Sequence, residues 1–400
     1  MGWLRTGSLL LLPAALLCIA AFGIADSGGS VFCNPTVYKR LNSLRVARHC
    51  FGLETPVRIA EGELESEIAV RSRQDLVTVR RRLIEYLWER PGLPLDRLPT
   101  SVQTGVDDSL FDDMDNLEHI DQLEIELEFG FLARAYHFLP RRGNGQLAIY
   151  HAGHDGSFRS TARATLDALL DKGFGILAFD MPMQGVNGWP ERLVVPGGGT
   201  LPLDGGSHWD LGFLETEGFA PLRLFMDPLL RAVNHVQARF AYRHIIMLGL
   251  SGGGWTTTVY AALDPRISRA YPVAGTLPRA LHRPHPVTGR YSSAGDYEQR
   301  VPAFYKIAGY LDLYVLGAAG QGRRELQIVN RYDPCCFFGS EALLYEPMVR
   351  RALEQIDLGG SFRVFVDDTH LEHAISPAAL ARIIEDALEA DAEAEEGLTL

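Results

Sequence analysis

The fold of this 400-residue chain is decided by one stretch, Ile245-Ile-Met-Leu-Gly-Leu-Ser-Gly-Gly-Gly254. The apolar run at 245–248 predicts a buried strand, and a helix is expected from about residue 252 to 263. Between them stands the pattern G-x-S-x-G, in which a sharp turn lifts the serine above the sheet and glycines leave room for close strand–helix approach. In this setting the pattern predicts that Ser251 is a nucleophile. An ordinary glycine-rich turn is the alternative.

Short apolar runs alternate with helical stretches along most of the chain. The run at 123–127 alternates with period two and has a hairpin partner at 132–139. Strands that alternate with helices need crossover connections, which favour a parallel sheet covered on both faces. The sequence therefore predicts an α/β fold with a mostly parallel central sheet and helices on both faces, with strands at 123–127, 147–150, 175–179, 245–248, 269–273, 326–329 and 362–366.

Two connections, residues 183–220 and 276–323, are too long to be plain loops. The first is rich in glycine and proline, and the second is polar and aromatic. Both follow strand ends on the side where ligands bind in open α/β sheets. We expect them to form a cap-like insertion that shapes a substrate pocket. His208, in the first of them, is expected to be a surface histidine.

The turn after the strand at 147–150 reads His151-Ala-Gly-His-Asp-Gly156. A glycine there lets the backbone turn, so that the following N–H can face the serine. We expect the backbone N–H groups of Gly252 and His154 to form an oxyanion hole. A metal pair at His151 and His154 is the alternative. No helix presents the two rings together and no further ligand stands near in sequence, so no metal is expected.

Asp333 stands just after the strand at 326–329, and Pro334 stiffens its loop. An acid at this place can orient a histidine and stabilise its imidazolium form. We therefore expect Asp333 to be the acid of a catalytic triad. A turn-forming Asp-Pro pair is the alternative, and Asp367 and Asp368 are reserve candidates for the acid.

Two histidines, His370 and His373, follow the last predicted strand. The next helix carries start signals, namely a hydrophobic staple, an N-cap serine and a proline at the first helical position, at Ile375, Leu380, Ser376 and Pro377. The staple would anchor the chain just after His373, and a general base must be held within hydrogen-bond reach of its nucleophile. We therefore expect His373 to be the base and keep His370 as the alternative base.

Residues 121–390 resemble the α/β-hydrolase superfamily. The resemblance rests on the turn at Ser251, the turn at 151–156, Asp333 and a late histidine, in the family's order of serine, acid and histidine. It covers roughly two thirds of the chain, and it departs from the commoner His-Gly turn at Ala152. The resemblance implies a serine hydrolase that cleaves carboxylic esters through an acyl-enzyme and needs no cofactor.

Other functions use the same triad or the same scaffold. A serine peptidase or an acyltransferase would differ mainly in the cap, and a non-catalytic hydrolase-like binding protein is the third alternative. The complete set of serine, acid and histidine disfavours the binding protein. The net charge of −12 disfavours a nucleic-acid partner, so the expected partner is a small-molecule ester.

The two ends of the chain have compositions of their own. Arg5 precedes an apolar run that ends in small residues before Asp26, so residues 1–25 are expected to be a signal peptide and the protein to be secreted or periplasmic. An uncleaved anchor at residues 8–24, with the catalytic domain outside the cytoplasm, is the alternative. Residues 26–120 are expected to be an N-terminal accessory helical segment, and residues 391–400 an acidic tail.

Four cysteines follow the expected signal peptide, at positions 33, 50, 335 and 336. An even number in an exported chain predicts disulfides. Cys33 with Cys50 is the local pairing, Cys335 with Cys336 would close a strained ring, and two bridges from the N-terminal pair to the C-terminal pair remain open. Free buried thiols are the alternative. We expect at least one disulfide that involves Cys33 or Cys50.

The expected signal peptide leads to the first prediction. The mature protein should begin near Asp26, because the small residues Gly23 and Ala25 fit a cleavage site. Intact-mass spectrometry of the native protein measures this. A protein that keeps Met1 and stays in the membrane fraction would favour the anchor instead.

Overall fold

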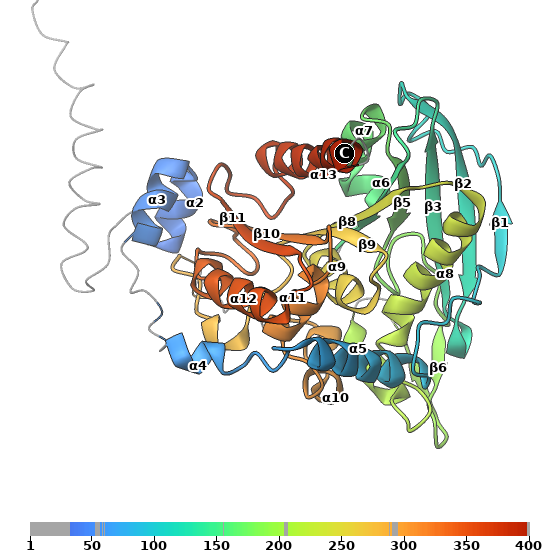
Figure 1. The fold of residues 1–400 in the computed structure, drawn as a ribbon, viewed down its shortest axis with the longest axis horizontal. Coiled ribbons are helices and arrows are strands. Elements are labelled where there is room, and N and C mark those ends of the chain that lie inside the picture. The colour runs from blue at the N-terminus through green and yellow to red at the C-terminus, as the bar shows by residue number, and fades with distance from the viewer. Residues whose placement is uncertain are drawn as a thin grey trace, which may run out of the picture.

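The computed structural model describes residues 33–52, 57, 59, 61–154, 156–203, 207–287, 289 and 295–397 (Figure 1). Residues 1–25, including the expected signal peptide and anchor, lie outside the described residues. Among the helices that the structure describes, none combines the length and the apolar character needed to cross a bilayer.

A nine-stranded sheet runs through the described part of the chain, in the order β1-β2-β3-β5-β4-β8-β9-β10-β11. Six neighbouring strands pair in parallel, namely β5, β4, β8, β9, β10 and β11. The strands β1, β2 and β3 form an antiparallel edge beside β5. The expected mostly parallel sheet is confirmed. Its strands are β1 (Ser101–Gln103), β2 (Leu117–Glu126), β3 (Leu132–Pro140), β4 (Gln146–His151), β5 (Gly175–Phe179), β8 (His244–Leu250), β9 (Ile267–Val273), β10 (Arg324–Asn330) and β11 (Ser361–Asp367).

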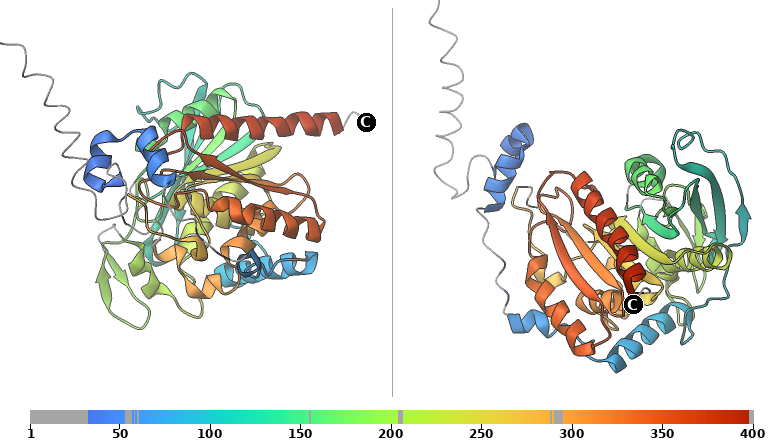
Figure 2. Two further views of the ribbon diagram at one scale, coloured as in Figure 1. Left: turned by 90° about the vertical axis from the view of Figure 1, so that its left-hand side faces the viewer. Right: turned by 45° about the horizontal axis from the view of Figure 1, so that its top comes forward.

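Successive residues of a strand point to opposite faces, and this period divides the core into two parts. On β8, Ile245 and Met247 pack into one apolar cluster, whereas Ile246 and Leu248 pack into the other. The first cluster joins the sheet to α5 (Arg73–Trp88), α8 (Arg223–Arg239), α9 (Gly252–Leu263), α11 (Tyr310–Ala318) and α12 (Ala342–Ile356). The second joins it to α6 (Phe158–Thr161), α7 (Arg163–Asp171) and α13 (Pro377–Gly397), so helices cover both faces (Figure 2).

The two long connections contain short elements. Residues 183–220 hold the hairpin β6 (Arg192–Val194) and β7 (Thr200–Pro202) and the 3₁₀ helix η3 (His208–Leu214). Residues 276–323 hold η4 (Arg279–Leu281), η5 (Tyr297–Gln299), α10 (Pro302–Tyr305) and helix α11. They follow β5 and β9 respectively, at the carboxyl edge of the parallel strands.

The N-terminal segment packs on the sheet domain at both ends. It begins with α2 (Pro35–Leu41) and α3 (Leu44–Gly52), joined by the disulfide Cys33–Cys50, and continues through α4 (Glu61–Glu65) into α5. The ring of Phe51 lies edge-on to the rings of Tyr332 and Phe338, with distances between ring centroids of 5.1 Å and 5.9 Å. Helix α3 therefore covers the loop that carries Asp333.

The cysteine pairing, which the sequence left open, is Cys33–Cys50 and Cys335–Cys336. The expected disulfide at Cys33 or Cys50 is confirmed. Neither disulfide therefore links the N-terminal helices to the sheet domain.

A buried carboxylate holds α5 and the chain after it against α8. One oxygen of Asp227 accepts hydrogen bonds from the indole N–H of Trp88 at 2.9 Å and from Arg97 at 2.9 Å. The other accepts one from Arg231 at 2.6 Å, and the side chain of Asp227 is fully buried. Three donors offset the cost of burying this charge.

Asp227→Ala should lower the free energy of unfolding by about 3–5 kcal/mol, because it leaves partly buried arginines without their counter-charge. Urea unfolding followed by circular dichroism measures this loss. The matched control is Glu85→Ala, which removes an exposed helix pair with Arg81 and should cost less than about 1 kcal/mol. Equal costs for the two substitutions would contradict the role given to Asp227.

Candidate active site

Ser251 occupies the turn between β8 and α9 in a backbone conformation that side chains rarely adopt, with φ 58° and ψ −120°. Its backbone N–H donates to the carbonyl oxygen of Val273 on the neighbouring β9 at 2.9 Å. Strain of this kind persists only where the surroundings hold it, and it gathers at functional sites. The sequence prediction of a sharp strand–turn–helix at Ser251 agrees with this geometry.

The glycines of the turn are required by backbone packing. A Cβ atom at Gly253 would overlap the carbonyl group of His151, and one at Gly249 would overlap the backbone of Gly253. Helix α9 can therefore begin directly above β8 and β4 only if these two positions lack side chains.

The turn after β4 lies directly on the serine turn. A Cβ atom at Gly153 would overlap Cβ of Ser251, and one at Gly252 would overlap the imidazole ring of His154. The structure thus brings Gly252, the first residue of α9, next to His154. The imidazole ring of His154 therefore lies against the first residue of α9, and Gly153, the residue before His154, lies against Ser251.

Asp333 and His373 form a hydrogen bond. Nδ1 of His373 lies 2.7 Å from Oδ2 of the buried Asp333. The other carboxylate oxygen, Oδ1, accepts the backbone N–H groups of Cys335 at 2.8 Å and Cys336 at 3.0 Å. Because an ionised carboxylate only accepts, Nδ1 carries the proton and Nε2 keeps a lone pair, as a general base requires.

The hydroxyl of Ser251 is not hydrogen-bonded to His373 or to His370 in the part of the chain that the structure describes. Catalytic hydrogen bonds are often long without substrate and tighten when substrate binds. The geometry therefore pairs Asp333 with His373 and places Ser251 on a separate turn at the same edge of the sheet.

Several solved esterase structures resemble this chain. The acetyl xylan esterase from Paenibacillus sp. R4 superposes with a TM-score of 0.51 and 19% identity over 82% of this chain and 99% of its own. The methylesterase BT1017 gives a TM-score of 0.55 and 16% identity over 84% of this chain and 70% of its own. Acetyl xylan esterase 1 from Thermoanaerobacterium sp. JW/SL YS485 gives a TM-score of 0.50 and 16% identity over 83% of this chain and 99% of its own. This chain has the α/β-hydrolase fold. No protein-family model and no curated protein matches it.

Around this α/β-hydrolase sheet, His370 pairs with another acid. Its Nε2 lies 3.4 Å from Oδ2 of Asp367, and that carboxylate raises the pKa of His370. Asp367 also accepts a short hydrogen bond from the hydroxyl of Ser376, the N-cap of α13. Asp368 lies at the surface, 3.6 Å from Arg48. His370 and Asp367 thus form a second pair, which holds the loop to α13.

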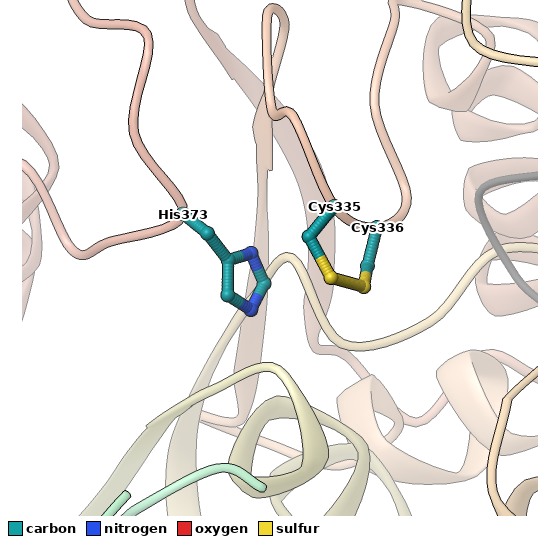
Figure 3. A group of neighbouring side chains, drawn as sticks. All are labelled: Cys335, Cys336 and His373. Carbon is teal, nitrogen blue, oxygen red and sulfur yellow. A yellow bond between two sulfur atoms is a disulfide. The ribbon is translucent and has the colours of Figure 1, made fainter. Parts of the chain in front are cut away.

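A disulfide between neighbouring residues stands beside the first pair. Cys335 and Cys336 are joined to each other, and a ring nitrogen of His373 and both sulfurs lie within 4.8 Å of one another (Figure 3). The two backbone N–H groups that hold Asp333 belong to these same cysteines. The disulfide therefore links the two residues that position the acid.

Two further histidines, His151 and His208, are buried. His151 is buried, its Nδ1 lies 2.8 Å from the carbonyl oxygen of Ala152, and burial lowers its pKa to about 4. His208 was expected at the surface, but it is only 2% exposed, so that prediction is wrong. It lies beside His154 and Glu298. Burial raises the pKa of Glu298, but the two histidines outweigh it and bring the pKa to about 2.

A basic cavity opens between the second insertion and the loop after Asp333. Its volume is about 370 Å³, and its lining residues are Arg279, His282, Gly295, Gln299, Arg300, Tyr310 and Phe337. The guanidinium of Arg300 also lies 5.9 Å from the ring centre of Trp209. The cavity therefore carries positive charge on a chain whose net charge is −12.

His373→Gln should reduce kcat by about a million-fold, as loss of a triad histidine does, because no other group then removes the serine proton. His370→Gln should keep most of the turnover, since His370 is paired with Asp367. Both rates are measured at neutral pH on one aryl ester, with circular dichroism as the check on folding. An inactive His370→Gln beside an active His373→Gln would exchange the two roles.

Proposed function

We propose that the chain is an exported serine hydrolase that cleaves carboxylic esters, with Ser251, His373 and Asp333 as its catalytic residues. The observation that carries the proposal is the hydrogen bond from His373 to the buried Asp333, at the sheet edge where Ser251 occupies its strained turn. A serine with an oriented histidine is the arrangement that acyl transfer requires.

In the proposed mechanism, Nε2 of His373 removes the proton of Ser251 as its Oγ attacks the ester carbonyl. The N–H groups of Gly252 and His154 bind the oxyanion of the tetrahedral intermediate. His373 then protonates the leaving alcohol, and Asp333 stabilises the imidazolium throughout. Water attacks the acyl-enzyme with His373 as base and releases the acid.

The surroundings of Asp333 support its role. Besides His373, it accepts hydrogen bonds from two backbone N–H groups and from the side-chain amide of Asn330 at 3.3 Å. With Oδ1 held by these backbone donors, the carboxylate directs Oδ2 at Nδ1 of His373. This network also fixes the carboxylate in space.

The proposed substrate is an ester with a polar or anionic part. The neighbours of known structure are named as acetyl xylan esterases and a methylesterase. In this chain Arg279 and Arg300 line the cavity that the second insertion forms, and arginine binds carboxylate and sugar hydroxyl groups well. We propose that residues 183–220 and 276–323 form the cap over this pocket.

A peptidase or an acyltransferase would use the same residues. A panel of an aryl acetate, an acetylated xylo-oligosaccharide, a methyl-esterified uronate and a matching anilide separates them. We expect hydrolysis of one or more esters and none of the anilide. Faster anilide cleavage would favour a peptidase, and transfer to an added alcohol that outpaces hydrolysis would favour an acyltransferase.

Ser251→Ala should abolish ester hydrolysis, with a loss of about 10⁶-fold in kcat, and should leave the fold intact. The matched control is Ser160→Ala, which removes an exposed hydroxyl far in sequence from the turn and should keep full activity. A serine-directed phosphonate should label the wild type once and the Ser251→Ala variant not at all. The proposal would be contradicted if Ser251→Ala kept more than about a tenth of the wild-type ester hydrolysis, or if the wild type hydrolysed no ester.

Export is part of the proposal. It rests on the pattern of residues 1–25 and on the disulfide Cys33–Cys50, a type of bond that persists in oxidising compartments. Residues 26–120 would then act as an accessory segment, since Phe51 in it packs against Tyr332 beside the proposed acid.

A further inference from the structure

One nitrogen of His154 has three polar neighbours. Its Nε2 lies 2.9 Å from Oε1 of Glu298, 3.3 Å from Nδ1 of His208 and 3.3 Å from Oδ2 of Asp296. An imidazole nitrogen carries one proton or one lone pair, directed in the plane of the ring. One hydrogen bond therefore does not explain why three atoms gather around this nitrogen.

The contacts of the second histidine, His208, are also not explained by hydrogen bonds of a neutral ring. Nε2 of His208 lies 2.9 Å from the carbonyl oxygen of Pro182, which only accepts, so the ring proton of a neutral His208 sits on Nε2. Its Nδ1 then presents a lone pair, yet it lies 3.0 Å from Oε2 of Glu298. Two lone pairs that face each other at this distance need a cation between them.

A proton on His208 would satisfy only part of the cluster. It would explain the contact of Nδ1 with Oε2 of Glu298 but not the three neighbours of His154. Glu298 is 0% exposed, and among the described residues no donor meets its other oxygen, Oε1, in hydrogen-bond geometry; Nε2 of His154 lies 2.9 Å from it as an ion-pair contact. A buried carboxylate oxygen without a donor is costly unless a positive ion lies against it.

We propose that His154, His208 and Glu298 bind a zinc ion, because one ligand atom of each lies within 4.8 Å of those of the other two. Zinc holds nitrogen and oxygen ligands at about 2.0–2.2 Å in a tetrahedron, which places ligand atoms about 3.3 Å apart. The three separations between atoms of His154, His208 and Glu298 are 2.9, 3.0 and 3.3 Å. The hydrogen bond from His208 to the carbonyl of Pro182 is the kind that orients a zinc-bound histidine.

The ligands come from three separate parts of the chain. His154 belongs to the turn after β4, His208 to η3 in the first insertion, and Glu298 to η5 in the second insertion. One ion would tie both insertions to the turn that lies on Gly252. It would act as a structural ion that fixes His154, and no step of ester cleavage passes through it.

This site differs from the metal pair considered from the sequence. That pair joined His151 to His154, but His151 bonds to its own chain at Ala152. The partners of His154 stand 54 and 144 residues further along, so no spacing motif announces them.

The test measures metal on the full-length purified chain. Elemental analysis should find about one zinc per chain, and a chelator should remove it. Zn²⁺ added to the stripped protein, in competition with a chromogenic indicator, should return to one site. Co²⁺ in its place should give the visible absorption of a tetrahedral complex.

Two pairs of variants assign the ligands. His208→Gln and Glu298→Gln should each lower Zn²⁺ affinity by more than the roughly 10–100-fold that loss of a supporting hydrogen bond costs. The matched controls are His119→Gln, at a partly exposed histidine, and Glu325→Gln, at another buried carboxylate; both should bind zinc as the wild type does.

The outcomes separate this inference from the proposed esterase activity, because zinc stoichiometry and Co²⁺ absorption need no turnover. Stripped wild type that stays folded by circular dichroism but binds neither Zn²⁺ nor Co²⁺ would overturn the inference. Zinc bound as tightly by His208→Gln as by wild type would overturn it as well. If a variant does not fold, the wild-type measurements decide alone.

Discussion

The structure depends on one constraint, which is backbone packed directly on backbone where β4, β8 and α9 meet. Gly249 and Gly253 have no room for a side chain. Gly153, in the turn after β4, also lies so close to Ser251 that a Cβ atom there would overlap it. This contact forces the positive φ of Ser251 and starts α9 close to the carboxyl edge of the sheet. The strained turn persists because main chain of the turn after β4 and of β9 contacts it directly.

The sheet supplies the rigid part of the site, and the connections supply the rest. Alternate side chains of the strands fill two cores, so the strand ends are fixed relative to one another. The turn with Ser251 and the loops with Asp333 and His373 leave from β8, β10 and β11, which lie within four consecutive strands of the sheet. The loop with Asp333 receives added support from Phe51 of the N-terminal segment. Rigid strands and braced loops together bring residues distant in sequence to one edge.

Local signals predicted what depends on local physics. Apolar runs marked the parallel strands, G-x-S-x-G marked the turn at Ser251, and the start signals of α13 singled out His373, which the structure places on Asp333. The buried cluster at Glu298 and the bond between Cys335 and Cys336 gave no such signal. Contacts between irregular segments follow no period, and four cysteines allow several pairings. The antiparallel edge was only partly predicted, because the short strand β1 has an exposed and irregular pattern.

The arrangement of His208 and Glu298 has a consequence for how the protein can change. Each insertion contributes one side of the same buried cluster, and both side chains are almost fully buried. An insertion exchanged alone, by recombination or in a designed chimaera, would leave a charged Glu298 or its histidine partner in the interior without its complement. A working exchange would therefore have to replace both insertions together, whereas the parts of each that lie away from this cluster, such as the β6–β7 hairpin, can be changed without burying an unpaired charge.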